Sequence, residues 1–181
     1  IGKVEIKDIR LDKISEISNS KKKIYNQLEF VDIAGLVKGA SKGEGLGNKF
    51  LSNLSQVDAI IHLVRCFKDK NITHVDKNIS PLKDISVIET ELLLSDLSKI
   101  EKIIENLKIK NKGKKIEPNL IEAYELASEK LNSGILLRDY NFTTEQLETL
   151  NLCNFLTLKP QIYVCNVDEN SLLNGNELTD E

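Results

Sequence analysis

The sequence lacks the features that mark a disulfide-rich, metal-binding or membrane-spanning protein. Its three cysteines, Cys66, Cys153 and Cys165, are odd in number and far apart, so they provide neither a disulfide framework nor metal-ligand spacing. No apolar run reaches the length of a membrane span, and the chain does not start with a signal-peptide pattern. These absences predict a protein of the reducing cytoplasm.

A strong excess of one charge sign is also absent. The net charge of −3 gives no general attraction to nucleic acid or membranes, so any such contact needs a local patch. The 181 residues, 40% hydrophobic and 29% charged, are enough for one soluble core with an appendage. The chain starts at Ile1 without Met, and we therefore expect a piece of a longer protein.

The most informative stretch is a short, mostly apolar run at 28–36, followed by a glycine-rich run at 37–47. The apolar run predicts a buried strand of a parallel sheet, with Asp32 at its carboxyl edge, where open α/β sheets bind ligands. An Asp there suits Mg²⁺, and the amide of Gly35 could approach a terminal phosphate. Asp-x-x-Gly after a strand is typical of nucleotide-hydrolysing switch proteins. The alternative is a solvated turn after a core strand.

The remaining pattern predicts an α/β protein. Alternation at 2–6 predicts an edge or half-buried strand, and helical spacing predicts helices at 8–20, at 48–55 and from Thr143, with Thr143 or Thr144 as N-cap. Apolar runs at 57–67 and 161–166 predict two more buried strands, the first ending near Phe67 at the ligand-facing edge.

Heptad spacing predicts two helices that form an antiparallel coiled-coil hairpin. Asn132, Ser133 and Gly134 end the second helix, and the longer arm would reach roughly 35 Å. We expect the hairpin to be an insertion at 85–140 in a partial nucleotide-binding domain formed by 1–84 and 141–181. The heptad positions are Leu93, Leu97, Ile100, Ile104 and Leu107, then Leu120, Tyr124, Ala127 and Leu131.

Four segments together resemble the YchF subfamily of Obg-like P-loop ATPases, of the TRAFAC class. They are residues 30–50, 64–67, 154–160 and 166–169, and the likeness extends over nearly the whole chain. The resemblance implies a G-domain-like P-loop NTPase fold, with a mainly parallel sheet and an inserted helical hairpin. It also implies ATP and Mg²⁺ as cofactors, GTP as a related nucleotide, and the ribosome as partner.

The chain departs from this family in one important respect. It contains no Gly-x-x-x-x-Gly-Lys-Ser/Thr motif, so the loop that cradles phosphates is absent. In the family this loop lies upstream of the strand at 2–6, and a TGS domain lies at the carboxyl end. We therefore expect residues 1–181 alone to bind nucleotide poorly and to hydrolyse none.

The resemblance implies that ATP is preferred over GTP. Guanine-specific relatives use Asn-Lys-x-Asp, whereas the matching block here is Asn166, Val167, Asp168 and Glu169. Val replaces the Lys that would cover the base, and the longer Glu places its carboxylate elsewhere. Asn166 and the Val167 backbone would then meet adenine, and Phe67 would stack on it. The alternative is that 166–169 is only a strand end and a turn.

The residue that positions the attacking water is less clearly marked. Ras-like switches place a Gln after the glycine of Asp-x-x-Gly, but Leu36 follows Gly35 here and has no group that could bind water. His62 is a candidate, because imidazole can orient water or act as a base near neutral pH. The alternative is a core histidine, and we expect His74 to be a surface residue.

A run of lysines at the hairpin tip suggests how a partner could be bound. The lysines either solvate the tip or meet phosphates, and the family resemblance implies the ribosome. Two functions follow: an ATPase whose switch loop couples nucleotide state to ribosome binding, or a nucleotide-gated ribosome- or RNA-binding module in which hydrolysis is incidental. A kinase is excluded because no kinase catalytic loop follows the glycine run. The lysines are Lys108, Lys110, Lys112, Lys114 and Lys115.

Overall fold

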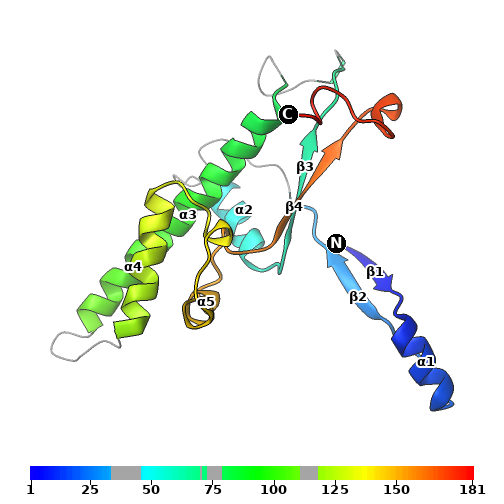
Figure 1. Ribbon diagram of the computed structural model, residues 1–181, viewed down its shortest axis with the longest axis horizontal. Coiled ribbons are helices and arrows are strands. Elements are labelled where there is room, and N and C mark those ends of the chain that lie inside the picture. Colours follow the sequence, from blue (N-terminus) through cyan, green and yellow to red (C-terminus); the bar gives the residue numbers. More distant parts are fainter. Residues whose placement is uncertain (34–45, 70, 73–78, 111–117) are drawn as a thin grey trace. The chain divides into compact units, whose positions relative to one another are not determined.

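A computed structural model describes residues 1–33, 46–69, 71–72, 79–110 and 118–181, and divides the chain into two compact units, Ile1–Ala34 and Gly35–Glu181 (Figure 1). The first unit contains β1 (Gly2–Ile6), α1 (Ile9–Ile17) and β2 (Asn26–Phe30). The second contains α2 (Leu46–Ser55), β3 (Ile60–Arg65), α3 (Pro81–Lys110), α4 (Pro118–Asn132), η2 (Leu137–Asp139), α5 (Thr144–Asn151), β4 (Gln161–Asn166) and η3 (Glu169–Ser171).

In the first unit, β1 and β2 form an antiparallel pair in which Val4 lies opposite Leu28. All five residues of β2 are exposed, so the prediction of a buried parallel strand before Asp32 is wrong for the pairing seen here. The physical reason lies in the alternation of the strand. Leu28 and Phe30 project from one face while Gln27 and Glu29 project from the other, which is a period-two pattern rather than a continuous apolar run.

In the second unit, β3 and β4 pair in parallel, as predicted, but the prediction that both are buried strands is wrong for β4, whose residues after Gln161 are all exposed. Their register runs from Ile60 opposite Gln161 to Arg65 opposite Asn166. The N–H of Cys66 donates to the carbonyl oxygen of Asn166 at 2.7 Å, which extends the pairing one residue further. Because the strands are parallel, both carboxyl ends lie at one edge, and the residues that follow them are neighbours.

The helices α3 and α4 lie side by side, as the heptad spacing predicted (Figure 1). All nine predicted heptad residues belong to one hydrophobic cluster, with Ile100 and Ala127 completely buried. The cluster also contains residues that come after the hairpin, so the two helices share their core with η2, α5 and the segment before β4. These later residues are Leu137, Phe142, Leu150 and Phe155.

Local signals in the sequence fix the ends of several helices. Gly134 follows α4 with a φ of +78°, a conformation that favours glycine. Thr143 is the N-cap of α5, and its hydroxyl accepts from the N–H of Gln146 at 3.3 Å. Helix α3 starts at Pro81, four residues before the predicted start, since Pro is well tolerated in the first turn of a helix. Among the described residues, no helix is long and apolar enough to span a membrane.

Two buried or half-buried polar groups attach β4 to the helices. The carboxylate of Asp96 on α3 accepts from the N–H groups of Leu156 and Thr157 at 2.9 and 2.7 Å and from the Thr157 hydroxyl at 2.7 Å. The ammonium of Lys159 donates to the carbonyls of Ser55 and Val57, at the end of α2. The segment that leads into β4 is thereby held from both sides.

Candidate functional site

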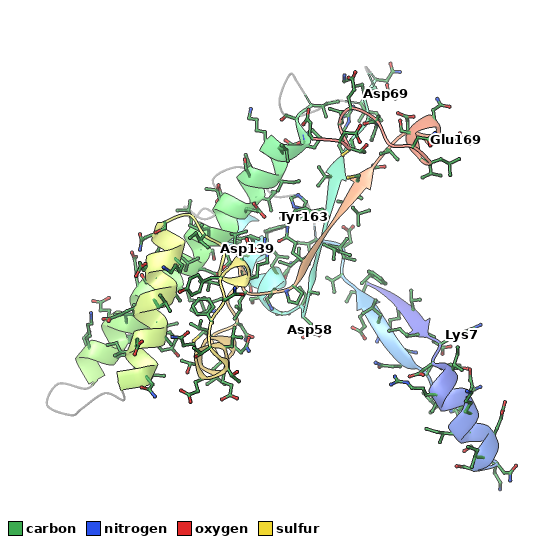
Figure 2. The ribbon with its side chains drawn as sticks, in the orientation of Figure 1. Lys7, Asp58, Asp69, Asp139, Tyr163 and Glu169 are labelled. Carbon is green, nitrogen blue, oxygen red and sulfur yellow. The ribbon has the colours of Figure 1, made fainter. Side chains whose placement is uncertain are left out.

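Four of the residues predicted to bind nucleotide lie at or just after the carboxyl ends of β3 and β4. Phe67 comes two residues after β3 ends, and Asn166 is the last residue of β4. Val167 and Glu169 follow directly, and Glu169 begins η3. Figure 2 labels Asp69 and Glu169, which both lie toward this end of the sheet. The structure thus brings together the residues predicted to contact a base.

Val167 and Asp168 both have structural roles at this edge. The side chain of Val167 packs against the cluster of Val64, Cys66 and Leu178. Because this side chain faces the core, the backbone is the part of Val167 left to meet a ligand. The Asp168 carboxylate accepts from the N–H of Ser171 at 3.0 Å and from its hydroxyl at 3.1 Å, which caps η3. The block is therefore an ordered strand end.

One residue that supports this edge has no recognisable pattern around it in the sequence. Asn176 lies in the polar terminal segment, and its side-chain amide donates to the carbonyl oxygen of Cys66 at 2.9 Å. The Asn176 side-chain oxygen accepts from the N–H of Leu178 at 2.9 Å, and Leu178 packs against Cys66. The segment from Asn176 to Leu178 therefore supports the end of β3, although it shows no helical or strand period.

His62 lies in the middle of β3, opposite Tyr163 on β4. Its Nδ1 is 3.4 Å from the side-chain amide nitrogen of Gln161, and its ring centroid is 5.6 Å from that of Tyr163. Burial lowers the pKa of His62 below its usual value, although Glu89 opposes this shift. His62 is three residues before Arg65, or about 10 Å from the carboxyl edge. His62 is half-buried at this position, and its role in catalysis stays a prediction.

A polar junction joins the sheet to α3 through Tyr163, the neighbour of His62 on β4. The Tyr163 hydroxyl donates to the carboxylate of Glu89 on α3. The same carboxylate pairs with the guanidinium of Arg138 at 3.1 Å, and the N–H of Arg138 donates to the carbonyl oxygen of Thr157 at 3.0 Å. The junction links β4, the helical hairpin and η2, and none of its members had a predicted role.

The predicted metal ligand belongs to the other unit. Asp32 follows β2 and is exposed. Among the described residues there is no cluster of three or more histidine, cysteine or acidic side chains. A single exposed carboxylate fits Mg²⁺, which takes one or two carboxylates together with waters and substrate phosphates. A dedicated site built only from protein ligands would need more donors.

Several predicted residues lie outside the part of the chain that the structure describes. They include Gly35 and Leu36, predicted to act in hydrolysis, and His74. Of the lysines at the hairpin tip, Lys108 is described, and its ammonium is 3.5 Å from the Glu125 carboxylate on α4. This exposed pair lies along the hairpin. The side chain of Lys110 and the whole of Lys112, Lys114 and Lys115 lie outside the described residues.

Comparisons with known proteins agree with the family resemblance. Residues 11–112 match the sequence model of a family described as "50S ribosome-binding GTPase". The "Ribosome-binding ATPase YchF" of Bacillus subtilis is 44% identical over 182 residues, covering 98% of this chain and 49% of the relative. The Mycoplasma genitalium protein of the same name is 44% identical over 174 residues, covering 96% and 47%.

A solved structure, described as the Schizosaccharomyces pombe YchF GTPase, is also similar. It is 34% identical to this chain, with a TM-score of 0.75, and the match covers 98% of this chain and 49% of that one. The chain thus spans about half the length of the relatives that it matches.

Proposed function

The chain belongs to the 50S ribosome-binding GTPase family and, within it, to the YchF subfamily, and on this basis we propose that the protein containing it hydrolyses ATP in preference to GTP. The observation that carries this proposal is the placement of Phe67, Asn166 and Val167 at one strand edge, beside an ordered turn. In open α/β sheets this edge is where nucleotides bind.

The chemistry of the edge supports adenine over guanine. Guanine recognition by a carboxylate needs an Asp that accepts two hydrogen bonds from the base, and such a bidentate contact discriminates by about 1–3 kcal/mol. Glu169 stands in that place, on a longer side chain that starts a 3₁₀ turn. The Asp168 carboxylate is already bonded to Ser171. We propose that the Asn166 amide and the Val167 backbone are the polar groups that meet adenine.

For hydrolysis, we propose that Asp32 binds Mg²⁺ and that the Gly35 amide approaches the terminal phosphate. Bound Mg²⁺ would neutralise charge that develops on the phosphates. Because Leu36 has no group that could orient water, His62 remains the predicted residue for that task. Burial lowers the pKa of His62, which favours the neutral imidazole.

The names of the relatives and the lysine-rich hairpin tip support the ribosome as partner. The relatives from Bacillus subtilis and Mycoplasma genitalium are both named as ribosome-binding. Lys108, Lys110, Lys112, Lys114 and Lys115 stand within eight positions of the sequence, and closely spaced cations suit phosphates of RNA. A ribosome-associated protein would act in the cytoplasm. The alternative function, a nucleotide-gated ribosome-binding module, uses the same surfaces.

The test uses an extended protein, in which these 181 residues follow the phosphate-binding segment that the family carries upstream. We expect this extended protein to hydrolyse ATP with Mg²⁺ and the 181 residues alone to hydrolyse none. Asp32→Asn should slow turnover at least about tenfold by weakening the metal site. Asp58→Asn is the matched control, because Asp58 is exposed before the amino end of β3 (Figure 2). Turnover by the 181 residues alone would contradict the proposal.

The two histidines are tested in the same assay. If His62 orients water, His62→Ala lowers turnover while ATP affinity is retained. His74→Ala serves as the comparison, since His74 is the other histidine of the chain. An unchanged rate for His62→Ala removes His62 as the candidate.

A further inference from the structure

Arg65 ends β3, and its guanidinium is surrounded by the backbone of the segment that follows. Its Nε donates to the carbonyl oxygen of Phe67 at 3.1 Å, one Nη to that of Ile72 at 3.1 Å, and the other Nη to that of Asp69 at 3.2 Å. The guanidinium carbon also lies 4.6 Å from the centroid of the Phe67 ring. One side chain therefore holds both the backbone and the ring of Phe67.

The chemistry of arginine suits this arrangement. A guanidinium presents five N–H donors in a fixed plane, so it can reach three carbonyl oxygens at once, whereas the single ammonium of lysine presents a compact point charge. Its charge is also attracted to the face of an aromatic ring. Among the described residues, Arg65 donates hydrogen bonds only to backbone carbonyl oxygens, and it forms no ion pair with an acidic side chain. The side chain is used to order the loop.

The loop that Arg65 orders is at the edge where the base is expected. Phe67 follows Cys66, whose N–H donates to the carbonyl oxygen of Asn166. The guanidinium lies over one face of the half-buried Phe67 ring, so a base that stacks on this ring would use the opposite face. We propose that Arg65 is a positioning residue that holds the Phe67 ring for stacking on the base of bound ATP. This inference rests on the proposed function, since it requires a nucleotide at this edge.

If Arg65 positions the Phe67 ring, the effects of these two residues on ATP affinity must be coupled. Loss of an aromatic stacking partner lowers the affinity for a base by about tenfold or more. Arg65→Ala frees the Phe67 ring, so it should weaken ATP binding about as much as Phe67→Ala does. If Arg65 acts through Phe67, the double variant should bind ATP no more weakly than Phe67→Ala alone. Because the three carbonyls are near solvent, water can replace the lost donors and the fold should persist.

The experiment measures ATP affinity by calorimetry, with Mg²⁺, in the extended protein. It compares wild type, Phe67→Ala, Arg65→Ala and the double variant. Arg65→Lys keeps the positive charge but loses the planar guanidinium with its several donors, so this variant should bind ATP as weakly as Arg65→Ala. Lys68→Ala is the matched control, since it removes one charge from an exposed ion pair with Glu177. Inorganic tripolyphosphate, which has no base, should bind wild type and Arg65→Ala equally.

The outcomes separate this inference from the function on which it rests. If wild type fails to bind ATP, the proposed function fails and the inference with it. If wild type binds ATP but Arg65→Ala binds it equally well, only the inference is overturned. An additive double variant would also overturn it, because Arg65 would then act independently of Phe67. Loss of tripolyphosphate binding in Arg65→Ala would indicate a general structural role and would overturn it too.

Discussion

Asp96 is a carboxylate enclosed by the protein, with 1% of its surface exposed and three hydrogen-bond donors around it. Burial is the largest influence on its pKa and raises the pKa above the usual 3.8, although the donors of Thr157 and Leu156 oppose this shift. The folded protein therefore keeps the proton at pH values where the unfolded chain has lost it. Stability must depend on pH as a result.

Asp96→Asn should lower the free energy of unfolding by about 1–3 kcal/mol, because its NH₂ group would face a donor. The advantage of wild type over this variant should be greatest below pH 3.8 and should fall as the pH rises through the raised pKa. Urea unfolding at several pH values measures both effects. Asp139→Asn, at an exposed position, is the control and should change stability by less than about 0.5 kcal/mol. An advantage that grows with pH would contradict this account.

At the scale of elements, the helical hairpin depends on residues that its sequence period identified. Ile100 lies on α3 and is completely buried in the cluster that α3 forms with α4 and the segment after α4. Ile109 lies on the same helix but is 55% exposed. The two isoleucines therefore provide a matched pair of positions, one inside the core and one at its margin.

Ile100→Ala should destabilise the hairpin by about 2–5 kcal/mol, since it leaves a cavity in a packed core. Ile109→Ala should change stability by less than about 0.5 kcal/mol. Amide hydrogen exchange across α3 and α4 measures the difference, because it reports the free energy of local opening. Equal effects of the two substitutions would show that the hairpin core lies elsewhere.

The elements also show why some features could be predicted and others not. Heptad spacing identified α3 and α4, because such a period reports which side chains are buried, whereas short apolar runs identified β3 and β4. The pairing of β2 was predicted wrongly, because the apolar Val31 and Ile33 that follow the strand obscure the alternation of its residues 27–30. Arg65 and Asn176 support the candidate site through bonds to backbone carbonyls, and such bonds leave no pattern in the sequence. Asn166 and Phe67 were found through the family resemblance, not through their period.

At the scale of the whole molecule, each unit carries some of the residues that we propose to act on the nucleotide. Asp32 belongs to Ile1–Ala34, whereas Phe67 and Asn166 belong to Gly35–Glu181. The phosphate-binding motif is absent from the 181 residues.

The switch role predicts that ribosome affinity depends on the bound nucleotide. The extended protein should bind ribosomes with different affinities in the presence of ATP, of ADP and of no nucleotide, since an effector shifts an equilibrium only by binding its states differently. Binding through the lysines at the hairpin tip should also weaken as salt rises. Sedimentation with ribosomes measures both. Equal affinities in all three states would exclude a switch, and salt-independent binding would exclude phosphate contacts.

The most direct measurement is the affinity of the extended protein for ATP and for GTP under identical conditions, in wild type and in Asn166→Ala. The account predicts that wild type binds ATP more tightly than GTP by at least about fivefold and that Asn166→Ala reduces this difference. GTP binding as tight as ATP binding, or a preference that Asn166→Ala leaves unchanged, would contradict the assignment of this strand edge as the base-binding site.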